Sequence, residues 1–116
     1  MRMWMIDPGK MCDKHLFGEH GELHKFRPSF EKGHSIAGRI RPITQIEPFS
    51  MKRRHDELTA EMERRTGKKY HSEYEMPDMS RYAQYADTTV NLTQSEFDLS
   101  SRCPECFARM FGNTAK

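Results

Sequence analysis

Apolar residues recur along three separate stretches of the chain at alternating intervals of four and three positions. This spacing puts one residue per turn on a single face of an α-helix, so each stretch predicts an amphipathic helix that packs through a narrow stripe. The three stripes are Cys12, Leu16, Leu23 and Phe26, with Glu19 intruding; Met51, His55, Leu58 and Met62; and Leu99, Cys103, Cys106 and Met110. The pattern predicts an all-α fold, a compact bundle of three main helices.

Helix boundaries follow from capping residues and helix breakers. The first stripe predicts a helix over residues 10–30, with Asp7 as its cap and Pro28 as the residue that kinks or ends it. The second helix is expected to be capped by Ser50 and stopped by Gly67.

The third helix is predicted to begin at a capping box, residues 93–96, and to kink or divide at Pro104. Long connections separate the helices: a basic loop over residues 33–48, and an irregular segment over residues 70–91 whose tyrosines pack onto the bundle. Together these elements predict a single domain spanning residues 1–116.

The amino-acid composition indicates the size of the core and the kinds of protein that the chain can form. With 116 residues, 35% hydrophobic and 31% charged, the chain can build one thin core under much solvated surface. It has no apolar run of membrane length and no evident signal peptide, and its odd count of three cysteines argues against a disulfide framework. We therefore expect a cytoplasmic protein that does not associate with membranes.

Positive charge is distributed unevenly along the chain. The net charge is only +2, but cations gather in KRRHDE, in ERRTGKK, and at Arg39 and Arg41. Clustered cations attract nucleic acid even when acids elsewhere cancel the total, although the same residues also suit a solvated helix face.

A histidine-rich stretch, HGELH, invites a metal interpretation. His20 and His24 have the i, i+4 spacing of two ligands to one metal. However, Glu22 lies about 200° around the helix from His20 and cannot act as the base at such a metal. No third ligand is indicated, so the pattern disfavours a catalytic zinc.

The CPEC sequence provides half of a zinc motif through Cys103 and Cys106. Cys12 and His15, spaced C-x-x-H, could complete a structural Cys3His site. The competing interpretation is that helical cysteines serve as small apolar residues. Zinc is thus a minority hypothesis, and the main expectation is that no cofactor is needed.

Another face of the first helix combines an imidazole, a glycine, an acid and a cation. His15 and Glu22 are seven positions apart and project within about 20° of each other, with Gly18 between them and Lys25 beyond. Glycine costs a helix up to about 1 kcal/mol, which favours a positional reason for Gly18 or Gly21. The alternative is a hydrated face of no special function.

The amino terminus is a further candidate. An α-amine titrates near pH 8, about two units below lysine, and is therefore partly neutral and nucleophilic. Beside a carboxylate it can attack an electrophilic carbon and form an imine. Most amino termini only fray, so the residues alone leave this open.

Two stretches resemble the phage-type pyrimidine-dimer DNA glycosylases, small "endonuclease V" enzymes that are also abasic-site lyases. The stretch HLFGEHGELHKF is similar to a helix in these enzymes with the pattern H-L-x-x-E-[YH]-x-E-L-x-[RK]. The stretch MKRRHDELTAEMERRTGKKY is similar to a second helix with the pattern R-x-x-E-L-x-x-E-x-x-x-R-G. The interval from Met1 to Glu22 equals that from the family's mature amino terminus to its catalytic glutamate. CFARMFG stands where the family has an aromatic-basic tail, and the middle loop here is shorter.

The resemblance implies a monomeric three-helix enzyme lying along the minor groove of double-stranded DNA. It implies that the Met1 amine attacks C1′ of a damaged nucleotide to give a Schiff base, and that Glu22 stabilises the sugar and assists β-elimination. The DNA-binding residues expected on this basis are Arg2, His15, Gly18, Gly21, Lys25, Arg39, Arg41, Lys52, Arg53, Phe107 and Phe111.

The sequence also departs from the family pattern. The best-known member exposes a threonine after losing its initiator methionine, whereas the bulky Arg2 here predicts that Met1 is retained. A family arginine that contacts DNA is replaced by Gly21, so the expected target is a damaged or modified pyrimidine other than a dimer. Alternative interpretations are a catalytically silent DNA-binding relative and a small zinc-stabilised interaction protein.

Overall fold

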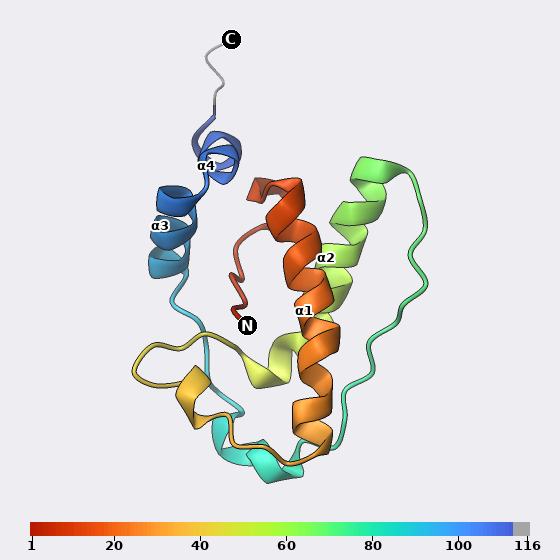
Figure 1. Cartoon of the computed structure of the whole chain (residues 1–116), viewed down its shortest axis with the longest axis vertical. Coiled ribbons are helices and arrows are strands. Elements are labelled where there is room, and N and C mark those ends of the chain that lie inside the picture. Colours follow the sequence, from red (N-terminus) through yellow and green to blue (C-terminus); the bar gives the residue numbers. More distant parts are fainter. Residues whose placement is uncertain (113–116) are drawn as a thin grey trace.

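The computed structural model describes residues 1–112, and every regular element in that part of the chain is helical. The two longest helices, α1 (Asp13–Glu31) and α2 (Met51–Thr66), pack side by side, while α3 (Leu92–Arg102) and α4 (Pro104–Phe111) lie on the other side of the amino-terminal arm (Figure 1). Short 3-10 turns are η1 (Pro8–Lys10), η2 (Ala37–Arg39), η3 (Pro48–Ser50) and η4 (Ser80–Tyr85). The predicted all-α class is confirmed.

The structure has four main helices in place of the predicted three. Cys103 adopts an extended conformation after α3, and Pro104 occupies the first turn of α4, where its missing N–H leaves no helical bond unmade. The predicted break at Pro104 is thus a complete division into two short helices.

The predicted start of the first helix is wrong, whereas its predicted end at residue 30 lies within one residue of the observed end at Glu31. Asp7 caps η1 through a bond from the Gly9 N–H to its carboxylate (2.9 Å), and α1 begins only after Cys12. Pro28 does not end α1, which continues to Glu31. A proline removes a single backbone donor, and the Pro28 carbonyl still accepts from the Lys32 N–H at 2.9 Å.

The predicted capping box of α3 is wrong, Ser50 occupies the predicted N-cap position of α2 without a side-chain capping bond, and the predicted stop at Gly67 is confirmed. Asn91, not the box at residues 93–96, caps α3, because its side chain accepts from the Gln94 N–H. The Ser50 hydroxyl makes no capping bond to α2 and accepts instead from the Arg53 guanidinium. Gly67 ends α2 in the left-handed conformation (φ 72°) that glycine adopts without strain.

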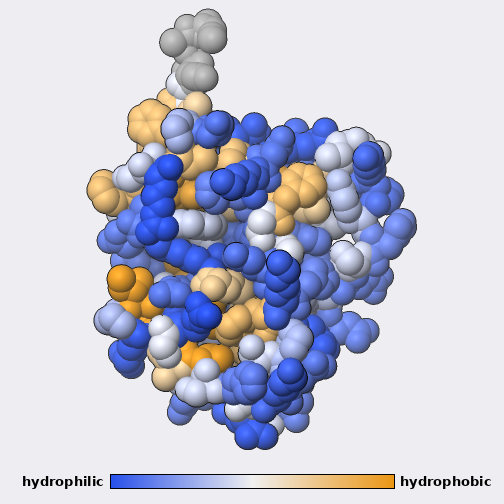
Figure 2. All heavy atoms as spheres, in the orientation of Figure 1, coloured by the Kyte–Doolittle hydropathy of each residue, from blue (hydrophilic) through white to orange (hydrophobic). Residues whose placement is uncertain are grey.

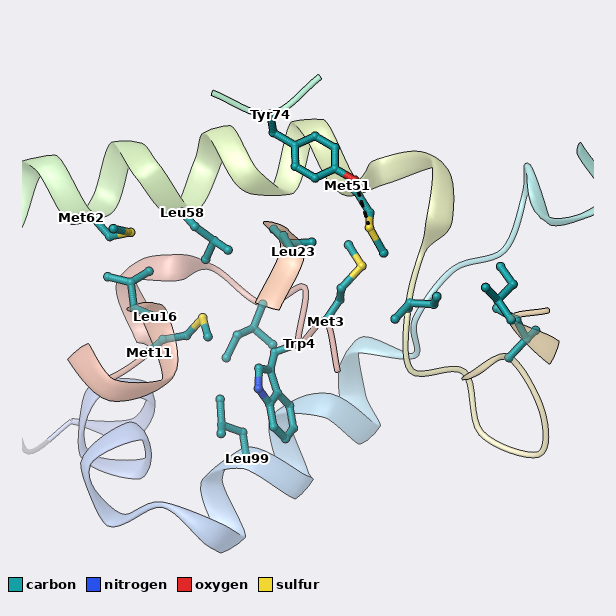
Figure 3. Packing of buried hydrophobic residues seen from close by; sticks show 14 of the residues in the cluster. Met3, Trp4, Met11, Leu16, Leu23, Met51, Leu58, Met62, Tyr74 and Leu99 are labelled. Carbon is teal, nitrogen blue, oxygen red and sulfur yellow. Dashed lines mark hydrogen bonds between the residues drawn. The ribbon is translucent and has the colours of Figure 1, made fainter. Parts of the chain in front are cut away.

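The core is thin and unites segments from both ends of the chain. Leu16 and Leu23 of α1, Leu58 of α2 and Leu99 of α3 are fully buried, and Trp4 from the amino-terminal arm lies among them (Figure 3). Cys12 and Phe26, predicted in the first stripe, are only partly buried. The outer surface seen in Figure 2 is mostly hydrophilic, with small apolar areas between charged side chains, as the composition predicts.

The long connections also contribute to the core. Ile36, Ile40 and Ile46 are buried, so the predicted basic loop over residues 33–48 also contributes side chains to the core. Tyr74 and Tyr82 are buried as expected for residues 70–91, and the Tyr82 hydroxyl donates to the His34 carbonyl at 2.7 Å. Among the described residues there is no helix with both the length and the apolar character to cross a membrane.

Candidate functional site

The amino-terminal arm is a packed part of the fold. Met3 is fully buried, and its N–H donates to the Gln45 carbonyl at 2.7 Å. The Trp4 N–H donates to Glu19 (3.3 Å) and the Trp4 carbonyl accepts from the Ser95 hydroxyl (2.7 Å). The arm is thereby tied to α1, α3 and the middle loop, so the chain start has a defined position.

Met1 and Glu22 line the same open hollow, which has a volume of about 660 Å³. Three cations, Arg2, Lys14 and Arg102, also line this hollow, with Arg102 coming from the end of α3. The Met1 side chain is half-buried and packs against the core. The first residue of the chain, an acidic residue and several cations therefore line one open hollow.

The predicted functional face of α1 opens onto this hollow. His15, Gly18 and Glu22 all line it, and Lys25 lines a smaller adjoining hollow with Met1, Glu22 and Phe26. A Cβ added at Gly18 or Gly21 would meet nothing within 4 Å. Packing within the described chain thus gives no reason for either glycine, and the space beside Gly18 belongs to the cavity.

The two glutamates of α1 have opposite environments. Glu19 is 2% exposed and ion-paired with Arg54, which is 1% exposed. Glu22 is exposed, and within residues 1–112 it forms no ion pair or side-chain hydrogen bond. Only Glu22 is free to interact with a ligand in the hollow.

Arg2 is held in place by interactions within the protein. Its guanidinium donates to the Asp98 carboxylate at 2.8 Å and lies 4.3 Å from the centre of the Trp4 ring. The hydrogen bond from Arg2 lowers the pKa of Asp98 below its usual range. Arg2 thus presents a fixed charge at the edge of the hollow.

The other predicted DNA contacts are exposed but lie outside the lining of the hollow. Arg41 and Lys52 are exposed, and Arg53 bonds only to neighbours on its own helix and the turn before it. Arg39 lies 5.8 Å from the ring of Phe26, beside the smaller hollow. The rings of Phe107 and Phe111 are more than half exposed and contact each other, with centroids 5.0 Å apart.

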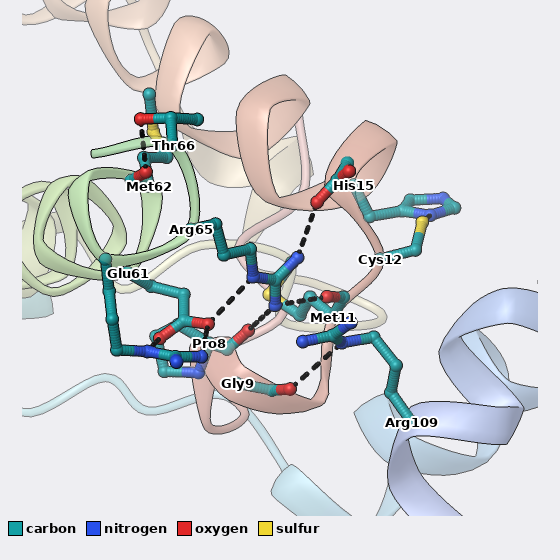
Figure 4. A network of polar contacts seen from close by, with 12 residues as sticks. Pro8, Gly9, Met11, Cys12, His15, Glu61, Met62, Arg65, Thr66 and Arg109 are labelled. Atoms are coloured by element: carbon teal, nitrogen blue, oxygen red, sulfur yellow. Dashed lines mark hydrogen bonds and ion pairs between the residues drawn. The ribbon is translucent and has the colours of Figure 1, made fainter. Parts of the chain in front are cut away.

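The four residues of the predicted Cys3His site come together. The sulfur of Cys12 lies beside the imidazole of His15 at the start of α1 (Figure 4), and Cys103 and Cys106 approach from the α3–α4 junction. The four ligand atoms lie within 4.8 Å of one another, so the cluster could hold a metal ion. Burial raises the pKa of the Cys106 thiol to about 12.

A second cluster corrects the expectation that HGELH has no third metal-ligating partner. His55 of α2 joins His20 and His24, with ring centroids 4.6 and 4.8 Å from theirs. Within the described part of the chain, Nε2 of His20 and Nε2 of His24 are buried without a hydrogen-bond partner. Burial lowers the pKa of His20 to about 4, with the nearby His55 and His24 adding to the effect. As predicted from helical geometry, Glu22 lies on a different face, in the hollow.

Sequence reasoning missed six of the residues that line the hollow: Trp4, Lys14, Glu19, Ile43, Gln45 and Arg102. Lys14 is four positions before Gly18 and so shares its helical face, a signal that helix periodicity could have revealed. Trp4 and Arg102 gave no such signal, because only the tertiary fold brings residue 102 to the amino terminus.

Comparison with known proteins agrees with the resemblance in the motifs. The family model described as pyrimidine dimer DNA glycosylase matches residues 1–76, which include the amino-terminal arm, α1 and α2. The match covers well over half of the chain, and the protein therefore belongs to the pyrimidine dimer DNA glycosylase family, whose members act on DNA. Neither a curated protein nor a solved structure matches the chain.

Proposed function

We propose that the protein is a DNA glycosylase with abasic-site lyase activity that excises a damaged or modified pyrimidine through the α-amine of Met1. The observation that carries the proposal is the shared hollow, in which the chain start and the unpaired Glu22 meet. Family membership supports DNA as the partner.

The reaction begins with extrusion of bases from the stack, which gives the amine access to the sugar. The Met1 nitrogen forms a bond to C1′ while the bond from C1′ to the base breaks, and the base leaves with the electron pair. The bond from C1′ to O4′ then breaks, O4′ takes up a proton, and the opened adduct is a protonated imine between the nitrogen and C1′. This electrophile activates the C2′ proton, whose removal expels the 3′ phosphate and cleaves the strand.

Glu22 is the group that we assign to proton transfer and charge stabilisation in these steps. A carboxylate beside the cationic imine stabilises it electrostatically, and the same group can accept a proton during elimination. Glu19 cannot take this role, since both of its oxygens bond to Arg54.

Phosphate binding is assigned to the cations around the hollow. Arg2, Lys14 and Arg102 line it, and Lys25 lines the adjoining one. Arg39, Arg41, Lys52 and Arg53 would extend the salt-dependent contacts along the duplex. The exposed rings of Phe107 and Phe111 suit contacts with sugars or unstacked bases.

Gly21 supports a target that differs from a pyrimidine dimer. It occupies the place of an arginine that contacts DNA in the resembling enzymes, and a side chain here would meet only open space. Because Gly21 has no side chain to contact DNA, other residues must determine which damaged base is recognised. UV-irradiated, abasic and hypermodified duplexes are therefore the substrates to compare.

Borohydride trapping tests the mechanism. Protein with a native amino terminus and a carboxy-terminal tag is expected to form a covalent adduct with abasic-site DNA when the imine is reduced. A Gly-Ser extension before Met1 should abolish the adduct, and Glu22→Gln should reduce it at least tenfold without loss of DNA binding. Binding without any adduct from the unblocked protein would refute the lyase and favour a silent DNA-binding relative.

A further inference from the structure

We propose that Cys12, His15, Cys103 and Cys106 bind one zinc ion, which fastens the α3–α4 junction to the start of α1. The ligand set is three thiolates and one imidazole, a combination typical of closed structural zinc sites. All three cysteines of the chain are in this one cluster, and none forms a disulfide. Cysteines used merely as small apolar residues have no reason to converge on a histidine.

The distances fit a tetrahedral zinc. With Zn–S near 2.3 Å and Zn–N near 2.0–2.1 Å, tetrahedral geometry puts two sulfurs about 3.8 Å apart and a sulfur and a nitrogen about 3.5 Å apart. The Sγ atoms of Cys12 and Cys103 are 3.7 Å apart. Nδ1 of His15 lies 3.6 Å from Cys106 Sγ and 3.3 Å from Cys12 Sγ. The ligands therefore need only small movements to enclose the ion.

Local backbone geometry holds the sulfurs in this arrangement. The Cys106 N–H points at Cys103 Sγ (3.4 Å), because Cys103 caps α4. The Cys12 N–H points at Cys106 Sγ (3.2 Å), across the junction between the two ends of the chain. Backbone donors directed at sulfur stabilise thiolate charge, and here they act against the burial that favours the neutral thiol of Cys106.

The position of the site means that a bound ion would connect two distant parts of the chain. Cys12 precedes α1 and Cys103 separates α3 from α4, so one ion would link elements 91 residues apart. Arg102, adjacent to Cys103, lines the hollow that contains Met1. The zinc would hold this arginine at the cavity, a consequence that rests on the proposed function, whereas metal binding itself does not.

Zinc coordination also changes the role expected for His15. An imidazole that ligates through Nδ1 is fixed in the wall of the hollow and is not free to move onto a phosphate. His15 is then a positioning residue shared by the two sites, and its replacement should release zinc even in the absence of DNA.

Metal analysis of the purified full-length chain tests the proposal. After equilibration with zinc and desalting, we expect one zinc per chain, reduced at least tenfold in Cys103→Ser and in His15→Asn. Two histidine variants are matched controls: His71→Asn, at an exposed position, and His24→Asn, in the separate histidine cluster, should both keep the ion. An unloaded wild-type protein, or zinc that persists in Cys103→Ser and is lost in His24→Asn, would overturn the proposal.

Cobalt substitution of the wild-type protein gives a second readout that is independent of whether a variant folds. Chelator-treated protein titrated with Co²⁺ should develop intense tetrahedral d–d bands and thiolate-to-cobalt charge-transfer bands at one equivalent. The weak spectrum of octahedral Co²⁺ would contradict a Cys3His site. Neither measurement involves DNA or turnover, so the zinc site and the glycosylase can fail separately.

Discussion

Glu19 and Arg54 form a two-point ion pair inside the protein, with bonds of 2.8 and 3.0 Å between the guanidinium and the carboxylate. The same arginine donates to the Ile6 carbonyl at 2.7 Å, and the same glutamate accepts from the Trp4 N–H. The pair thus joins α1, α2 and the amino-terminal arm, and it determines where Met1 lies.

Removing one member of this pair should destabilise the whole fold. Glu19→Gln leaves the Arg54 guanidinium buried without the carboxylate charge that compensates it, and breaking a buried pair in this way costs about 3–5 kcal/mol. We expect a loss of this size in the free energy of unfolding, measured by urea denaturation. Glu22→Gln is the matched control on the same helix and should change stability by less than about 0.5 kcal/mol, because Glu22 is exposed. Equal losses in the two variants would contradict the structural role of Glu19.

The histidine cluster predicts that stability falls in mild acid. The pKa of His20 is lowered to about 4 by burial and by its histidine neighbours, whereas the unfolded chain protonates near pH 6.5. Between these values the unfolded state binds the proton more strongly, so stability is fully present above about pH 6.5 and declines as the pH falls towards 4. The total loss is on the order of 3 kcal/mol.

Denaturation midpoints between pH 4 and 7 measure this effect. His20→Gln, which does not titrate, should flatten the profile, whereas His71→Gln at an exposed position should leave it unchanged. An unaltered slope in His20→Gln would mean that other groups cause the acid sensitivity.

Arg65 connects α2 to the turn before α1. Its guanidinium donates to the carbonyls of Pro8 (3.1 Å) and Met11 (2.7 Å) and pairs with Asp13 and Glu61 (Figure 4). Lysine has a single ammonium group and cannot form the several in-plane hydrogen bonds that the guanidinium N–H groups donate here. Arg65→Lys should therefore lower the free energy of unfolding by about 1.5–3 kcal/mol, following the cost of lost charged hydrogen bonds.

The neighbouring arginine provides the control for that substitution. Arg64 is two-thirds exposed and, among residues 1–112, pairs only with Glu61, so Arg64→Lys should cost less than about 0.5 kcal/mol. Thermal and urea unfolding of the two variants compare the positions directly. If the two variants had equal free energies of unfolding, the contacts of Arg65 with the amino-terminal arm would make no net contribution to stability.

Much of the helical core followed from local patterns. The stripes through Leu16, Leu23, Leu58 and Leu99 are buried because periodicity alone decides which face of a helix is apolar. The caps were less predictable. Asp7 caps the turn before α1, and Asn91 caps α3 in place of the predicted box, because several polar residues near each helix start compete for the same backbone donors, and tertiary packing selects among them.

The site was predictable only where one helix contains it. Helical geometry separated Glu22 from His20 and aligned it with His15, and these residues do share the hollow. No local pattern could bring His55 to the pair His20 and His24, since α2 supplies it through helix packing. Arg102 and Trp4 reach the hollow through contacts between the chain ends for the same reason.

The affinity for DNA should fall as the salt concentration rises, because the cations at the hollow and along α2 bind phosphates. Lys14 lines the hollow and Arg53 is an exposed cation on α2. If each neutralises one phosphate, Lys14→Gln and Arg53→Gln should each weaken binding and reduce the slope of log K against log salt by about one.

Lys68 offers the control, because it is exposed, follows the end of α2 and does not line the hollow. Lys68→Gln has the same charge change and should leave both affinity and slope within error of the wild type. Fluorescence anisotropy with a short abasic duplex between 50 and 300 mM salt measures all three variants. An unchanged slope in Arg53→Gln would show that α2 does not contact the DNA. An unchanged slope in Lys14→Gln would show that the hollow does not bind a phosphate, and this result would contradict attack by the Met1 amine on C1′ within the hollow.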